Sequence, residues 1–65
     1  MVKRAAYWTN HAYISRSPFE TLQLAAYALR SEGIPETEAM EWLWPHVQAL
    51  CPLLGREKAR RGLGL

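Results

Sequence analysis

The sequence predicts an all-α protein built on a small helical hairpin. Residues 17–34, which read SPFETLQLAAYALRSEGI, carry helix start and stop signals at their two ends. Apolar residues then recur every three or four positions from Ala39 to Leu54, as on one face of a helix. A chain of 65 residues forms one domain. We expect an N-terminal arm at 1–16, a hairpin at 17–54 with helices over about 18–32 and 35–51, and a basic tail at 55–65.

The first expected helix has specified ends. Ser17 is placed to cap the first turn, with Pro18 at the first helical position and Glu20 completing a capping box. Gly33 is expected in a left-handed conformation that ends the helix, and Ile34 then folds back in a Schellman motif.

This helix carries apolar residues on two faces. At ~100° per residue one face holds five of them, and the opposite face holds three. The first set is Phe19, Leu22, Ala25, Ala26 and Leu29, and the second is Leu24, Tyr27 and Ala28. The second set needs a cover, either from the N-terminal segment or from another copy of the chain. We expect a homodimer that pairs through it.

The second expected helix contains a proline. Pro45 points away from the apolar face, so we expect one helix kinked there; two short helices divided at Trp44 are the alternative. The first turns of this helix contain three glutamates, Glu36, Glu38 and Glu41. The helix dipole favours carboxylates at this end, and this explains the three glutamates better than a catalytic role does.

Large side chains on the margins of the hairpin are the candidate protein-binding residues. Trp42 and Trp44 lie on opposite flanks of the second helix, and tryptophan is enriched among interface anchors. The alternative is that each closes one side of the core with an aromatic residue of the N-terminal arm. The candidate set is Trp42, Trp44, Tyr27, Leu24 and Met40.

Charge follows a basic, acidic, basic order along the chain, with a formal net charge of +2. Arginine and lysine supply the sequence-independent part of nucleic-acid affinity. The candidate nucleic-acid residues are Lys3, Arg4, Arg56, Lys58, Arg60 and Arg61. A solvated, frayed tail at 55–65 is the other interpretation, and the one we favour.

The sequence lacks the motifs that are typical of several classes of enzyme. The chain has no phosphate-binding glycine loop, no nucleophile elbow and no Asp, so we expect no enzyme, no cofactor and no small-molecule substrate. Cys51 is the single cysteine. A zinc site built from Cys51, His46 and His11 is conceivable, but we expect no metal. No apolar stretch approaches the ~18 residues of a membrane helix, so we expect a cytoplasmic protein without membrane contact.

The pattern over residues 17–63 resembles the small helical module found after the catalytic domain of some plasmid and phage primases. That module has two amphipathic helices joined at a glycine, then a P-x-L segment and a charged helix. The matching residues are Leu22, Ala25, Leu29, Arg30, Gly33, Glu36, Glu38, Ala39, Leu43, Leu50, Cys51, Pro52, Leu54, Glu57, Arg60 and Arg61. Ser17, Pro18 and Pro45 depart from it. The resemblance implies a small phage- or plasmid-type protein.

Two functions are therefore predicted. The first is a regulatory or inhibitory module that binds a partner protein through an aromatic helical surface. The second is a DNA- or RNA-binding accessory protein that uses the basic terminal segments.

Overall fold

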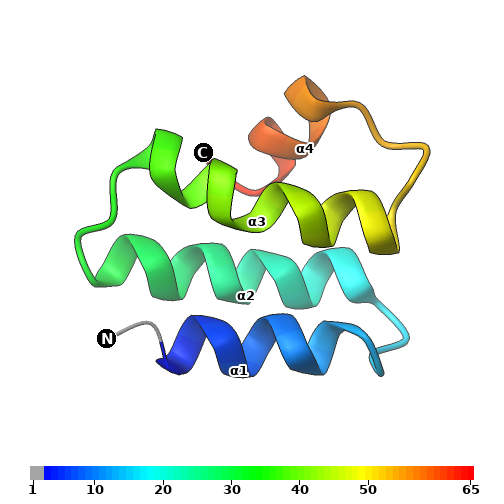
Figure 1. The fold of residues 1–65 in the computed structure, drawn as a ribbon, viewed down its shortest axis with the longest axis horizontal. Helices are drawn as coiled ribbons and strands as arrows, with labels where there is room; N and C mark the ends of the chain where they lie inside the picture. Colours follow the sequence, from blue (N-terminus) through cyan, green and yellow to red (C-terminus); the bar gives the residue numbers. More distant parts are fainter. Residues whose placement is uncertain (1–2) are drawn as a thin grey trace.

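The computed structural model describes residues 3–65, and these form four α-helices and no strand. The helices are α1 (Lys3–Ala12), α2 (Pro18–Ser31), α3 (Glu36–Leu50) and α4 (Arg56–Gly62). The all-α prediction is confirmed, and α2 and α3 match the two expected helices to within one residue at each end. Figure 1 shows α2 between α1 and α3, with α4 beside α3.

The expected arm at 1–16 is a helix that belongs to the core. Residues 1–2 of that arm lie outside the described residues. Ala5, Thr9 and Ala12 form the buried face of α1, and their small size lets α1 approach α2 closely. Thr9 tolerates burial because its hydroxyl lies 3.1 Å from the carbonyl oxygen of Ala5 and 3.0 Å from that of Ala6, within hydrogen-bond reach of both. The arm was expected to be either extended or a short helix, and the helical alternative is confirmed.

The start of α2 differs from the predicted capping box. The Ser17 side chain makes no capping hydrogen bond. Its carbonyl oxygen instead accepts hydrogen bonds from the Thr21 amide and from the Thr21 hydroxyl, both at 3.1 Å. Ser15 organises the turn, because its Oγ accepts the Ser17 amide at 3.0 Å and lies 2.9 Å from the Thr21 hydroxyl.

Two helices end in the same Schellman motif. After α2, Gly33 has φ +83°, and the Ile34 amide donates to the Leu29 carbonyl at 3.1 Å. After α4, Gly64 has φ +76°, and the Leu65 amide donates to the Arg60 carbonyl at 2.9 Å. The first stop was predicted. The second was not, and it turns the chain end back onto the protein.

The third helix runs unbroken from Glu36 to Leu50 with Pro45 inside it. Pro45 is exposed, as its place on the helical wheel predicts. Two helices divided at Trp44 are therefore excluded, whereas the kink at Pro45 stays a prediction.

The core draws on all four helices. Its largest fully buried side chains are Leu22, Leu29, Leu43 and Val47, which come from α2 and α3. The chain end adds Ala59, Leu63 and Leu65, all buried. Residues 55–65 are therefore not a solvated tail: they form α4 and a buried leucine pair. This corrects the expectation of a frayed terminus.

Candidate interaction surface

An aromatic cluster joins α3 to the turn that follows α1. The Tyr13 hydroxyl lies 2.9 Å from Nδ1 of His46, and the two rings meet edge to face with centroids 5.8 Å apart. One helical turn before His46, Trp42 places its ring 5.7 Å from the imidazole. Trp42 and His46 are half-buried and Tyr13 is exposed. We call Tyr13, Trp42 and His46 the aromatic cluster.

A second set of rings lies on α1. Tyr7 stacks on His11 with centroids 5.7 Å apart, and it meets Trp8 edge to face at 5.0 Å. Trp8 packs against the core, whereas Tyr7 and His11 are exposed. α1 also contacts α3. Aromatic side chains therefore reach the surface on α1, in the turn after it and on α3.

Trp44 is engaged within the chain. The Arg56 guanidinium lies 5.3 Å from the centroid of its ring, a cation–π distance, and the same guanidinium forms an ion pair with Glu41 at 2.6 Å. Trp44 therefore holds α4 against α3. Both tryptophans pack partly against the core. Trp44 does so beside α4 and not beside the N-terminal segment, and Trp42 does so in the aromatic cluster with Tyr13. Their role as interface anchors stays a prediction.

Two predicted interface residues are buried. Met40 is 3% exposed and packs in the core, so it offers a partner almost no surface. Ala28 is also buried, so the predicted pairing of two copies through Ala28 is excluded in this conformation. Leu24 and Tyr27 remain on the surface, 46% and 71% exposed. They lie on the outward side of α2.

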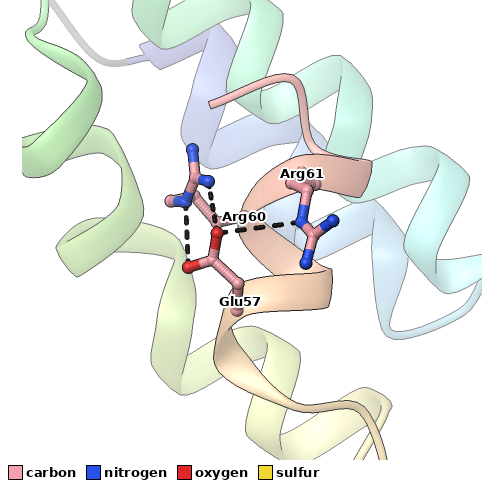
Figure 2. Close-up of polar contacts among 3 residues, drawn as sticks. All are labelled: Glu57, Arg60 and Arg61. Atoms are coloured by element: carbon pink, nitrogen blue, oxygen red, sulfur yellow. Dashed lines mark hydrogen bonds and ion pairs between the residues drawn. The ribbon is translucent and has the colours of Figure 1, made fainter.

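Three of the four basic residues of α4 lie in exposed ion pairs, which they form with two glutamates. Glu57 pairs with Arg60, and it lies 3.7 Å from Nε of Arg61 (Figure 2). The hydrogen bond from Arg60 lowers the pKa of Glu57 below its ordinary value, and the same bond raises the pKa of Arg60. With Arg56 bound to Glu41, only Lys58 of the four bases in α4 lacks an ion pair within residues 3–65.

The candidate nucleic-acid residues do not form one patch. Lys3 and Arg4 begin α1, whereas the other four belong to α4. Figure 1 shows α1 and α4 at opposite edges of the molecule, with α2 and α3 between them. The expected basic footprint is therefore split in two, and its larger half is mostly paired.

Two hollows lie on the surface of the described residues. A cleft of about 290 Å³ lies between the start of α3 and α4, and it is lined by Glu36, Thr37, Met40, Glu41, Arg56, Arg60 and Leu65. A more open, apolar hollow is lined by Phe19, Cys51, Pro52, Leu53 and Leu54. Within the described part of the chain, no three His, Cys, Asp or Glu residues come together as a metal site. No helix there has the length and apolarity needed to cross a bilayer.

Sequence reasoning missed two members of the aromatic cluster. His46 was weighed only as a metal ligand, and Tyr13 only as a cover for a tryptophan. The available signal was the spacing of Trp42 and His46, since residues four apart share one side of a helix. Nothing local in the sequence links Tyr13 to His46, which lie 33 residues apart.

Comparison with protein-family models, with curated proteins and with solved structures gives no match for this chain. The resemblance to the primase module over residues 17–63 is therefore still a hypothesis.

Proposed function

We propose that this chain is a small, non-enzymatic regulatory or inhibitory module of phage or plasmid type, acting in the cytoplasm. It binds a partner protein through the aromatic cluster of Tyr13, Trp42 and His46, and it works as a homodimer. It needs no cofactor, metal or small-molecule substrate for this role, and it does not act at a membrane.

The half-buried Trp42 carries this proposal. A tryptophan that packs on His46 yet stays partly open to solvent offers a large apolar surface at a low cost in side-chain entropy. Tyr13 fixes the imidazole through its hydroxyl, so the cluster is organised before a partner arrives. Preorganised aromatic residues of this kind are typical binding anchors.

Capture of proteins from lysate of the source cells tests the proposal. The wild-type chain is compared with Trp42→Ala, His46→Ala and the matched control Gln48→Ala, which changes an exposed residue on the same half of α3. We expect a protein that wild type and Gln48→Ala retain and that both cluster variants lose. Circular dichroism of each variant separates loss of binding from loss of folding. Equal retention by all four chains would contradict the proposal.

A DNA- or RNA-binding accessory role is the second candidate. Lys3, Arg4 and Lys58 support it, because all three are exposed and none is in an ion pair within the described residues. Titration of duplex and single-stranded DNA across a salt series tests it, since phosphate contacts give a steep negative slope. Absence of binding at low salt would remove this role.

A further inference from the structure

The exposed side of α2 carries an apolar pair flanked by two opposite charges. Leu24 and Tyr27 lie near its middle, with Glu20 toward the start and Arg30 toward the end, and all four are exposed. The apolar pair is centred on the Ala25–Ala26 step, and the charged pair is centred on Ala25, half a residue away. Glu20 and Arg30 are about 15 Å apart along the axis, from a rise of ~1.5 Å per residue.

Both charged groups are available to a partner. Neither Glu20 nor Arg30 forms an ion pair within residues 3–65. Arg30 donates one hydrogen bond, from Nη1 to the Ile34 carbonyl, and a guanidinium has further N–H groups to offer. The ends of this face therefore carry opposite, unpaired charges.

We propose that the outward face of α2 binds the same face of a second copy, with the two helices antiparallel. A two-fold axis at Ala25–Ala26 places Leu24 against Tyr27 of the second copy, and Tyr27 against its Leu24. The same axis places each Glu20 opposite Ser31 of the other chain. Arg30 of that chain is then one residue away, about 1.5 Å along the axis, and its long side chain can reach the carboxylate, so both charge pairs form together. Antiparallel α2 helices also oppose their dipoles favourably. Such isologous pairing is the commonest form of small homodimer.

This inference rests on the dimer in the proposed function and names its surface. It replaces the predicted contact through Ala28, which is buried. One helix face is smaller than the ~800 Å² per partner of a standard interface, so we expect a dimer that dissociates on dilution. α2 and the aromatic cluster share no residue, which leaves the cluster open to a partner protein.

Charge reversal tests the pairing, with sedimentation equilibrium from about 10 μM to about 1 mM as the assay. In a dimer of Glu20→Arg, each new arginine would lie next to Arg30 of the other chain, so both charge pairs become repulsive. In a dimer of Arg30→Glu, each new glutamate would lie next to Glu20 of the other chain, with the same effect. We expect each single variant to dimerise about tenfold or more weakly than wild type. The double variant restores both pairs and should dimerise like wild type. An equimolar mixture of the two single variants should form a heterodimer, because both of its cross-pairs are again opposite in charge.

The matched control is Glu38→Arg, which reverses an exposed charge on α3 and should leave dimerisation unchanged. Circular dichroism measures the helix content of each variant. The double variant carries both substitutions, so a loss of dimerisation caused by damage to the ends of α2 would persist in it, whereas a loss caused by like charges would be reversed. Tyr27→Ser, which removes the apolar contact, should also abolish the dimer. A monomer at every concentration would overturn the inference, as would a dimer that ignores the charge reversals or a mixture that stays monomeric. None of these results alters capture by the aromatic cluster. A monomer at every concentration would also contradict the homodimer of the proposed function, whereas a dimer that ignores the charge reversals would contradict only this pairing.

Discussion

Replacement of Leu63 and Leu65 by alanine tests whether residues 55–65 belong to the fold. These side chains are 6% and 8% exposed, and the Schellman motif at Gly64 directs them into the core. Replacing one buried leucine by alanine costs about 2–5 kcal/mol. A domain of this size has about 3–10 kcal/mol in total, at ~0.05–0.15 kcal/mol per residue. Leu63→Ala should therefore destabilise the fold severely, and the double variant should be unfolded at room temperature.

Urea denaturation followed by circular dichroism measures the effect. Lys58→Ala is the control, because Lys58 is exposed on α4, the helix that precedes the two leucines. It should leave the midpoint within experimental error of wild type. A double variant of Leu63 and Leu65 that keeps wild-type helicity and midpoint would refute the reasoning. It would show that residues 55–65 are the solvated tail that their composition predicts.

Four further substitutions test local features of the fold. Ser17→Ala should cost less than ~0.5 kcal/mol, whereas Ser15→Ala should cost about 1 kcal/mol, because only the Ser15 hydroxyl bonds the turn before α2; equal midpoints in urea would contradict this. Gly33→Ala should lower stability by about 1 kcal/mol, since alanine is strained at φ +83°, and an unchanged melting temperature would count against it. The pKa of Glu57 is lowered by Arg60, so this pair stabilises the fold above the unfolded pKa near 4.5, and that contribution is lost as pH falls through the folded value. In Arg60→Ala, NMR titration should show the pKa of Glu57 moving upward, and a carboxyl that titrates as in wild type would exclude the pairing.

Helix stops and apolar spacing were predictable from the sequence because they are local. Gly33 can be recognised as a left-handed stop without knowing any tertiary contact. The buried faces of α2 and α3 follow in the same way from residues three and four apart. Pro45 was placed on the solvent side by the same helical wheel.

The sequence did not distinguish a first helix from an extended arm, because the packing of this helix depends on small residues. Ala5, Thr9 and Ala12 give almost no hydrophobic signal, and the exposed Tyr7 obscures the pattern they form. These small residues contribute by letting α2 pack close to α1. That contribution depends on both helices, so the sequence of one helix does not show it. Spacings of four and three between small residues are the pattern to look for.

The role of α4 was misjudged because charge dominates its composition. Four bases in six positions indicate a solvated segment, yet their partners are Glu41 and Glu57. Glu41 lies 15 residues away from Arg56, so this neutralisation depends on the fold. The aromatic cluster was hidden for the same reason, since Tyr13 meets His46 only in three dimensions.

The most direct test of the proposed function is the salt dependence of binding to the captured partner protein. Isothermal titration of wild-type chain with that partner is repeated between about 50 mM and 500 mM salt, where the screening length falls from roughly 14 Å to 4 Å. If Trp42 and its neighbours supply the affinity, Kd should change less than about threefold over this range, because apolar contacts are not screened. A fall in affinity of about 100-fold or more would contradict the proposal, and would indicate that the basic residues carry the interaction.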